Sequence, residues 1–359
     1  MIEDLLPAWG GEEVVVRFDE PSATWMFVCV HSTVLGPGAG GTRMKVYAEP
    51  RDALGDGLRL SSAMTSKNAM AGLPLGGGKA VLAVSEIPEG ERRRDLFRRY
   101  GDLVESLHGT YVTACDMNTG PPDMDVIAER SSSVFGRTEE NGGSGTSAPN
   151  TAVGVFHGIR AAVGQAFGSD DLGGRTVAIQ GVGAVGDPLS RFLAEAGARL
   201  TLADVDDVRA KELAGELEAE AVPADRIAEV ECDVFSPCAT GGVLNAETIP
   251  SLRCRVIAGA ANNQLGEPAD AERLAERGIL YAPDYVVNAG GVIHLVGYEM
   301  LHEGDVEVQS RLLGIGETLG EVFGLAEAEG ISTGAAADEI VAQRLSAAQW
   351  TSQRTGGDA

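Results

Sequence analysis

The chain has 359 residues, of which 44% are apolar and 23% charged, and its formal net charge at pH 7 is −25. This length favours two domains, and the balance of apolar and charged residues excludes a wholly disordered chain. The strong acidity argues against nucleic acids and anionic membranes as partners, because both carry negative charge. The sequence also has no run of about 20 apolar residues, which excludes a membrane-spanning helix.

The five cysteines and five histidines form no pattern typical of disulfides or metals. Since neither C-x-x-C nor H-E-x-x-H spacing occurs, the sequence predicts no metal site. The cysteines are interpreted instead as small buried apolar residues. The stretch Met1–Val16 is acidic and lacks the layout of a secretory signal, so we expect a protein of the reducing cytoplasm.

The first third of the chain mixes strand and helix patterns. An antiparallel pair is expected first, because two β-rich runs flank the turn-like stretch 19–24. Apolar residues at helical spacing then alternate with short buried runs. The expected strands are Val14–Phe18, Trp25–His31, Lys79–Val84 and Tyr111–Cys115, and the expected helices are Asp52–Met70, Glu91–Leu107 and Pro121–Arg130.

Residues 136–150 are poor in apolar side chains and predict a hinge or a crossing between domains. After a helix over Thr151–Phe167, strands and helices alternate to about Tyr285, which is typical of a doubly wound parallel sheet. Late strands are expected at Val256–Ala261 and Ile279–Pro283. The last 50 residues predict helices, one with an apolar face formed by Leu312, Ile315, Leu319, Val322 and Leu325.

A glycine motif follows the predicted strand Val177–Gln180 and opens a helix. Its spacing is Gly181-x-Gly183-x-x-Gly186, with Val182, Ala184 and Val185 between the glycines. Such a loop lets a pyrophosphate approach the backbone at a helix N-terminus, so it predicts a Rossmann dinucleotide site. Asp204 ends the next strand, where a carboxylate accepts from ribose hydroxyls and repels a 2′-phosphate. NAD is therefore expected as the cofactor rather than NADP.

Only four lysines occur in the chain, and two of them, Lys67 and Lys79, are twelve residues apart. Chemistry that needs a deprotonated amine cannot use arginine, so this choice of residue favours a catalytic site over two solvated lysines. Two ammonium groups in one site would also lower each other's pKa, which suits one of them as a general base. Asp116 ends a predicted strand just before a Gly-Pro turn. On its own, it could equally be a turn residue.

Six segments, taken in order, resemble the Glu/Leu/Phe/Val dehydrogenase family over nearly the whole chain. The segments AANNQL and GGVIHLVG, together with DMNT after the strand Tyr111–Cys115, resemble the phenylalanine dehydrogenases of that family. Cys115 before Asp116 departs from the family pattern. The six segments are LGPGAGGTRM, MTSKNAMAGLPLGGGKAV, CDMNTGPPDMD, QGVGAVG, GAANNQL and APDYVVNAGGVIH.

The resemblance implies a role for each matched residue. Lys67 would bind the substrate α-carboxylate, Lys79 would activate water, and Asp116 would move protons at the amino nitrogen. Further substrate contacts would come from the backbone of Gly40 and Gly41, from Asn262 or Asn263, and from pocket walls at Ala39, Ala114, Val292 and Leu295. Thr151 and Asn288 would lie near the nicotinamide.

The expected fold is α/β: residues 1–140 form an N-terminal α/β domain for substrate binding and oligomerisation, and residues 141–334 form a C-terminal Rossmann domain. A cleft is expected between them, with a helix at about 335–359 packing back on the first. The expected partners are an amino acid or 2-oxo acid, ammonia and further copies of the chain, as a dimer or octamer.

The sequence therefore predicts NAD-dependent oxidative deamination of an apolar L-amino acid. Ala39 stands where leucine-type members carry a larger residue, which favours phenylalanine or another bulky side chain. The alternative is a leucine or valine dehydrogenase, if Val292 and Leu295 close that space. A 2-hydroxy-acid dehydrogenase or a non-catalytic NAD-binding regulator fits less well, since neither needs two lysines and an aspartate together.

Overall fold

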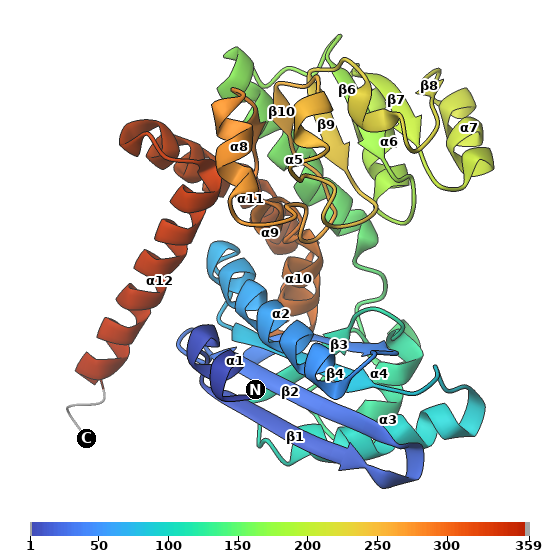
Figure 1. The fold of residues 1–359 in the computed structure, drawn as a ribbon, viewed down its shortest axis with the longest axis vertical. Coiled ribbons are helices and arrows are strands. Elements are labelled where there is room, and N and C mark those ends of the chain that lie inside the picture. Colours follow the sequence, from blue (N-terminus) through green and yellow to red (C-terminus); the bar gives the residue numbers. More distant parts are fainter. Residues whose placement is uncertain (1, 356–359) are drawn as a thin grey trace. The chain divides into compact units, whose positions relative to one another are not determined.

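The computed structural model describes residues 2–355, which divide into two compact units (Figure 1). The chain passes from the first unit to the second at Thr146/Ser147. It returns for residues 298–302 and again from Ala342 onward. Each unit has its own sheet and its own apolar core.

The first unit is built around a five-stranded sheet in the order β1-β2-β4-β3-β5. Strands β1, β2 and β4 pair antiparallel, whereas β3 runs parallel to both β4 and β5. The elements are α1 (Ile2–Trp9), β1 (Glu13–Asp19), β2 (Thr24–Ser32), β3 (Gly38–Lys45), α2 (Pro50–Met70), β4 (Gly76–Ala83), α3 (Gly90–Glu105), β5 (Tyr111–Cys115) and α4 (Pro121–Ala128).

Helices cover both faces of this sheet. Helix α2 packs on one face through Leu54 and Leu58, against Phe27 and Val81 of the strands. Helices α3 and α4 pack on the other face, where the core includes the fully buried Tyr100. The Tyr100 hydroxyl lies 2.7 Å from Thr42 Oγ1 and 3.2 Å from Thr113 Oγ1, so its polar end is satisfied inside the core.

The structure confirms the antiparallel pair at the start of the chain and the three helices expected in this unit. It also contains β3, which the sequence analysis did not predict. The segment GAGGTRMK holds three glycines, which weaken the propensity for a strand. Pairing with β4 on one side and β5 on the other overrides that weakness.

The second unit carries a six-stranded parallel sheet in the order β11-β10-β9-β6-β7-β8. Numbered from its first strand, this is the 3-2-1-4-5-6 order of a Rossmann sheet, so the predicted fold class is confirmed. The elements from Ala148 onward are α5 (Ala148–Phe167), β6 (Thr176–Gln180), α6 (Gly186–Glu195), β7 (Arg199–Ala203), α7 (Asp207–Glu216), β8 (Glu220–Ala221), β9 (Val234–Pro237), β10 (Val256–Ile257), α8 (Asp270–Glu276), β11 (Leu280–Tyr281), α9 (Asp284–Val287), α10 (Gly290–Leu295), a π-helical turn (Val296–Met300), α11 (Asp305–Glu329) and α12 (Thr333–Thr355). Of these, the end of the π-helical turn and α12 from Ala342 onward belong to the first unit.

Two local expectations need correction. The late strands are only two residues long, at Val256–Ile257 and Leu280–Tyr281, and Gly259 after the first of them packs against the backbone of Pro237. The apolar face of α11 continues to Phe323 and Ala326, both buried, whereas Leu325 is only half-buried. The long helix was expected correctly, but its buried stripe drifts by one residue over its last turn.

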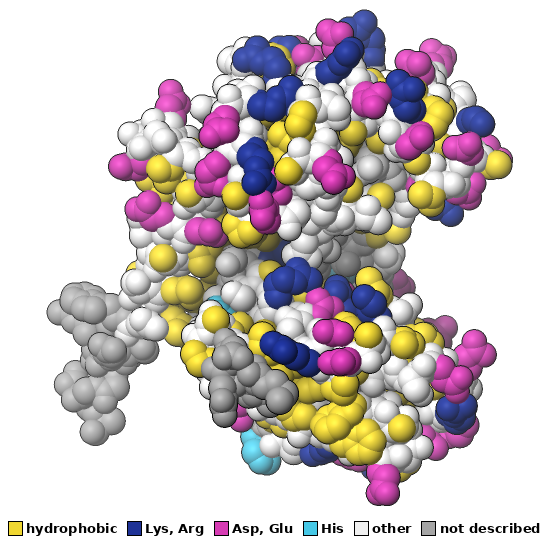
Figure 2. Space-filling view, in the orientation of Figure 1, with side chains coloured by type: hydrophobic (Ala, Val, Ile, Leu, Met, Phe, Trp, Pro, Cys, Tyr) yellow, Lys and Arg dark blue, Asp and Glu magenta, His cyan; other side chains and the backbone are white. Residues whose placement is uncertain are grey.

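The cysteines have the environment expected from the sequence only in part. All five are free thiols; Cys29 and Cys254 are buried, whereas Cys115, Cys232 and Cys238 are half-buried. Burial raises the pKa of Cys29, Cys115 and Cys232 to about 12. Within residues 2–355, no helix is long and apolar enough to cross a membrane. On the face shown in Figure 2, acidic side chains are scattered over the surface among fewer basic ones.

The glycines of β3 permit the close approach of β4, and this can be tested. A Cβ atom on Gly40 would lie 1.9 Å from the backbone oxygen of Gly78. Gly40→Ala should therefore lower the stability of the chain by about 1–3 kcal/mol, as overpacked core substitutions do. The midpoint of urea unfolding measures this.

Gly320→Ala provides the matched control, because Gly320 is exposed in the middle of α11 and its Cβ would meet nothing within 4 Å. Alanine should raise stability there by about 0.5–1 kcal/mol. Equal effects of the two substitutions would contradict the role given to Gly40.

Candidate active site

Three charged side chains lie together on the α2 face of the first sheet. Arg43 is on β3, Lys79 is on β4, and Asp116 directly follows β5. Side chains alternate between the faces of a strand, and the neighbours Thr42, Ala80 and Cys115 point to the α3 face. The register pairs Thr42 with both Ala80 and Cys115. The chain neighbours of these three residues, Arg43, Lys79 and Asp116, therefore lie close together on the opposite face.

The central contact is an ion pair between Lys79 and Asp116. Lys79 Nζ lies 2.7 Å from Asp116 Oδ2; the Lys79 side chain is 7% exposed, and that of Asp116 is 23% exposed. Gly41 makes room for the pair, since a Cβ there would lie 2.8 Å from Asp116 Cβ and 2.4 Å from Cys115 O. Two reacting groups proposed from the sequence are therefore in direct contact.

A tight turn after β5 fixes the backbone of Asp116. Its amide donates to Thr119 Oγ1 at 2.9 Å, and the amide of Thr119 donates back to Asp116 O at 3.0 Å. Thr119 Oγ1 also donates to Thr42 O on β3. Within the turn, Asn118 adopts a left-handed φ of 59°. Asp116 is thus also a turn residue, and the turn holds its backbone at the end of the strand.

The electrostatic environment favours an amine that loses its proton easily. Burial lowers the pKa of Lys79, contact with Asp116 opposes this, and Arg43 adds to the lowering; the net pKa lies below 10.5. Burial raises the pKa of Asp116, but Lys79 and Arg43 more than offset it, so the pKa lies below its ordinary value. Arg43 is therefore a cation beside Lys79 that the sequence analysis did not expect, and the predicted effect of Lys67 on Lys79 stays a prediction.

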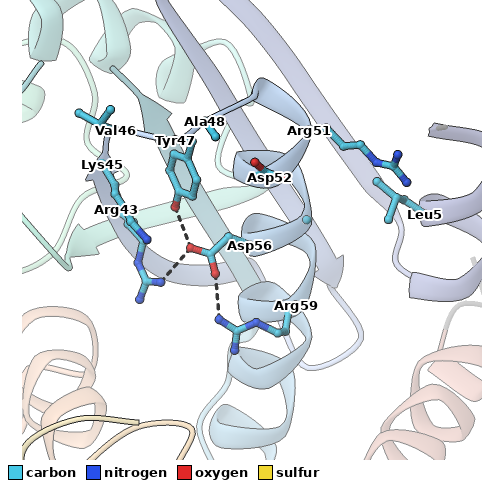
Figure 3. Close-up of a pocket in the computed structure, with 11 residues that line it drawn as sticks. Leu5, Arg43, Lys45, Val46, Tyr47, Ala48, Arg51, Asp52, Asp56 and Arg59 are labelled. Atoms are coloured by element: carbon cyan, nitrogen blue, oxygen red, sulfur yellow. Dashed lines mark hydrogen bonds and ion pairs between the residues drawn. The ribbon is translucent and has the colours of Figure 1, made fainter. Parts of the chain in front are cut away.

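Arg43 and its partner Asp56 were missed by sequence reasoning. Arg43 Nε donates to Asp116 Oδ2 at 3.0 Å, and Arg43 Nη1 donates to Asp56 Oδ2 at 2.9 Å. Figure 3 shows Arg43, Asp56, Tyr47 and Arg59 linked in one network. The arginine follows a glycine pair in a segment not recognised as a strand, so its direction could not be inferred.

Lys67 lies in the last turn of α2 and is half-buried. That end of the helix approaches β4 closely, because Asn68 Nδ2 donates to Gly76 O at 2.6 Å and a Cβ on Gly77 would lie 2.0 Å from Thr65 Oγ1. The glycines before Lys79 therefore bring the helix that carries Lys67 onto the strand that carries Lys79. Arg344 of α12 donates to the carbonyls of Ala69 and Met70 at the same helix end.

The proposed pocket residues come from both units. Ala39 pairs with Val112 and Gly41 pairs with Ala114, so Ala39 and Ala114 share the face of the sheet that carries Arg43 and Asp116. Val292 and Leu295 lie on α10 of the second unit, one turn apart and half-buried. Each pair is placed within its own unit.

In the second unit, the glycine motif has the geometry of a dinucleotide loop. Gly181 takes a φ of 94°, and a Cβ on Gly186 would lie 1.9 Å from Gly181 O, whereas a Cβ on Gly183 would meet nothing within 4 Å. Asp204 is tied to the loop, because its Oδ2 accepts from the amide of Val182 at 2.8 Å. The loop connects the end of β6 to the start of α6. The strand order of the sheet reverses at β6, and such sheets bind ligands at this switch point.

The remaining candidates cluster at the same end of this sheet. Asn288 Nδ2 donates to Asn262 Oδ1 at 2.9 Å, whereas its buried Oδ1 accepts no hydrogen bond within the described chain. The backbone of Asn263 is held by Asp284, with its amide 2.6 Å from Oδ2. Thr151 lies beside the NAGG run, since a Cβ on Gly291 would be 3.0 Å from Thr151 Oγ1. A buried, unpartnered acceptor suits the amide group of a nicotinamide.

Within residues 2–355, no group of three or more His, Cys, Asp or Glu side chains could hold a metal ion. The polar groups that the structure brings together are instead an amine, a carboxylate and a guanidinium in one unit, and an amide-lined glycine loop in the other. The first set suits acid–base chemistry, and the second suits a dinucleotide.

Comparison with known proteins gives consistent matches. A family model described as Glu/Leu/Phe/Val dehydrogenase, dimerisation domain, matches residues 17–133. A second, described as Glutamate/Leucine/Phenylalanine/Valine dehydrogenase, matches residues 201–311.

Curated relatives span nearly the whole chain. Leucine dehydrogenase of Thermoactinomyces intermedius is 42% identical over 344 residues, covering 96% of this chain and 93% of that protein. Valine dehydrogenase of Streptomyces albus is 44% identical over 344 residues, covering 95% and 93%. Among solved structures, an L-tryptophan dehydrogenase from Nostoc punctiforme matches with a TM-score of 0.85 and 38% identity, covering 97% of this chain and 99% of that one.

Two glycines of the loop, one open and one closely packed, predict different outcomes for the same substitution. Gly183→Ala should leave the midpoint of thermal unfolding unchanged, because its Cβ meets no protein atom, but should weaken NADH binding by blocking the approach of a pyrophosphate. Gly186→Ala should lower both the midpoint of thermal unfolding and the affinity for NADH, because its Cβ clashes with Gly181 O. Fluorescence titration with NADH and thermal unfolding of each variant test this; unchanged NADH affinity in Gly183→Ala would contradict the assignment.

Proposed function

Because the chain belongs to the Glu/Leu/Phe/Val dehydrogenase family, and is thus an amino-acid dehydrogenase with a nicotinamide cofactor, we propose that it carries out NAD-dependent, reversible oxidative deamination of an apolar L-amino acid. The products are the 2-oxo acid, ammonia and NADH. The observation that carries this proposal is the buried Lys79 in contact with Asp116, at the end of β5 in the family's dimerisation domain.

In this mechanism Lys67 binds the substrate α-carboxylate, together with the backbone at Gly40 and Gly41. The bound nicotinamide supplies the acceptor for the hydrogen that leaves Cα. Lys79, in its neutral form, takes a proton from the water that attacks the imino carbon. Asp116 moves protons to and from the nitrogen as ammonia departs. The lowered pKa of Lys79 supports this role, since a base must be neutral at the working pH.

The glycine loop Gly181–Gly186 and Asp204 would hold the dinucleotide, and Thr151 and Asn288 would hold the nicotinamide amide. The free Oδ1 of Asn288 supports the last assignment. NAD is preferred in this proposal because Asp204 places a negative charge beside the loop, where NADP would bring a further phosphate. Asn262 and Asn263 are both kept as contacts to the substrate amino group.

The relatives refine the substrate. Their names point to leucine and valine. A branched-chain substrate is therefore better supported than the phenylalanine substrate predicted from the sequence. The likeness to a tryptophan dehydrogenase at 38% identity keeps bulky apolar side chains within the range. Ala39, 4% exposed on the site face of β3, would leave room for them. We therefore propose leucine-like substrates first and aromatic ones second.

A panel of 2-oxo acids assayed with NADH, with and without ammonium, tests the proposed function. We expect NADH oxidation only when ammonium is present, fastest on 4-methyl-2-oxopentanoate or 2-oxoisovalerate, with the L-amino acid as product. NADH oxidation without ammonium, giving a 2-hydroxy acid, would overturn the proposal. So would NADH binding without turnover on any 2-oxo acid, which is the behaviour of a non-catalytic regulator.

Homo-oligomers are part of this proposal, either dimers or octamers, and β1 offers a place for the contact. It is an edge strand of the sheet, and edge strands are apt to pair with another chain. Val16, Phe18 and Trp25 on β1 and β2 are 46%, 48% and 37% exposed. Hydrophobic side chains gather over these strands in Figure 2. A cytoplasmic location is also proposed, since five free thiols suit a reducing compartment.

Removing the proposed base should separate chemistry from binding. Lys79→Ala should lower kcat by ~10²–10⁴-fold, the usual worth of general acid–base catalysis, while NADH still binds. Lys211→Ala, on the exposed surface of α7, is the matched lysine control and should behave as wild type. In the wild type, the rate of deamination should rise with pH through a pKa below 10.5, because Lys79 must lose its proton. Near wild-type turnover in Lys79→Ala would refute its role.

Asp204 is expected to set the choice between cofactors. Asp204→Ser removes the charge that repels a 2′-phosphate, so the ratio of kcat/KM for NAD to that for NADP should fall. Asp207→Ser removes an equal charge from the exposed start of α7 and should leave the ratio unchanged. If the wild type used NADP as well as NAD, or if both variants changed the ratio equally, this assignment would fail.

A further inference from the structure

A guanidinium group connects two carboxylates behind the Lys79–Asp116 pair. Arg43 donates to Asp116 through Nε and to Asp56 through Nη1, at 3.0 and 2.9 Å. Tyr47 OH donates to the same oxygen of Asp56 at 2.7 Å, and Arg59 donates to the other oxygen at 2.8 Å. Figure 3 shows Arg43 extended from β3 toward Asp56 on α2, along the wall of an open pocket. Asp56 therefore fixes Arg43 from the side away from Asp116.

The two cations on Asp116 share one of its oxygens. Lys79 Nζ and Arg43 Nε lie 2.7 and 3.0 Å from Oδ2, and Arg43 Nε donates its hydrogen bond to that oxygen. Two donors on one oxygen restrict the rotation of a carboxylate and leave the other oxygen for a further partner. The Asp116 side chain is 23% exposed, so a ligand can reach the carboxyl group. The turn from Asp116 to Thr119 holds only the backbone, so the side-chain orientation depends on these donors.

The charges along this row alternate and are stable. Burial lowers the pKa of Arg43, but Asp116 and Asp56 raise it above its ordinary value, so the guanidinium keeps its charge. Burial raises the pKa of Asp56, and Tyr47 and Arg43 bring it below its ordinary value, so Asp56 keeps its negative charge. The row is therefore Asp56, Arg43, Asp116 and Lys79, and burial and Arg43 lower the pKa of Lys79 within it.

We propose that Arg43, anchored by Asp56, is a positioning residue for the deamination reaction. It holds Asp116 by Oδ2, so that Oδ1 is presented to the reacting nitrogen. Its positive charge also opposes the positive form of Lys79, so that Lys79 releases its proton more readily. This inference rests on the proposed function and extends it to two residues that carry no assigned role in the site.

Three variants separate geometry from charge. Arg43→Gln removes the charge and the two-point contact. Arg43→Lys keeps the charge, but one ammonium group cannot donate to both carboxylates in the fork geometry of a guanidinium. Arg59→Gln is the matched control, because Arg59 also pairs with Asp56 but does not touch Asp116, and its side chain is 55% exposed.

In the Arg43→Gln variant, kcat should fall by about 100-fold, the order of loss for a misplaced reacting group, with the KM for the 2-oxo acid little changed. The rising limb of the pH–rate profile should move to higher pH, because losing a nearby positive charge raises the pKa of Lys79. Arg43→Lys should lower kcat as well but keep the limb near the wild-type position. Arg59→Gln should match the wild type in both.

A purely structural role would lower thermal stability and kcat together without moving the limb, and that result would overturn the inference. It would also be overturned if Arg43→Gln kept the wild-type kcat, if Arg43→Lys moved the limb as far as Arg43→Gln, or if Arg59→Gln gave the same changes. The charged groups that act on Lys79 include Asp116, Arg43 and Asp56, with Tyr47 and Arg59 behind Asp56. The variants change Arg43 and Arg59 and leave the other groups in place.

A second readout does not depend on turnover. The rate at which acetic anhydride acetylates Lys79, followed by mass spectrometry of the peptide across pH, reports the neutral fraction of that amine. Its midpoint should move upward in Arg43→Gln but not in Arg59→Gln. A wild-type protein without ammonium-dependent turnover would refute the proposed function alone, and an unmoved acetylation midpoint would refute the electrostatic role of Arg43 alone.

Discussion

A buried lysine that shares one carboxylate with an arginine is the constraint on which the first unit depends. Lys79 is 6% exposed, and a charged lysine is tolerated in a protein interior only when it is paired. Asp116 provides that partner. The neighbouring strands β4, β3 and β5 must then approach closely enough for Lys79, Arg43 and Asp116 to contact one another. Gly40, Gly41 and the run before Lys79 satisfy this requirement, since side chains there would clash with the backbone.

The second unit also uses glycines for close approach, but there they form a ligand-binding loop. Gly186 brings α6 against the turn at Gly181, and Gly183 leaves an open backbone where a phosphate can lie. One unit thus removes side chains to bring charges of its own together, whereas the other removes them to admit the charge of a ligand. The high glycine content of the chain, 48 residues, is explained at these positions by close approach rather than by flexible loops.

The sequence was sufficient for the Rossmann sheet, the glycine loop and the Lys79–Asp116 pair, because each has a local pattern or a family motif. Strand β3 was missed, since its glycines hide the strand propensity and only pairing with β4 and β5 reveals it. Arg43 and Asp56 were missed for the same reason: a contact between β3, α2 and the end of β5 depends on register, which no local pattern encodes. The sequence predicted a lowered pKa for Lys79 from Lys67, and the structure adds burial and Arg43 as causes that no local pattern showed.

The most direct test of this account is the protonation of Lys79 itself. The chain has only four lysines, so NMR of protein labelled with ¹³Cε-lysine follows each of them separately across pH. We predict that one resonance, absent in Lys79→Ala, titrates below 10.5. If the Lys79 resonance titrated at or above the ordinary pKa of lysine, the central claim would be contradicted.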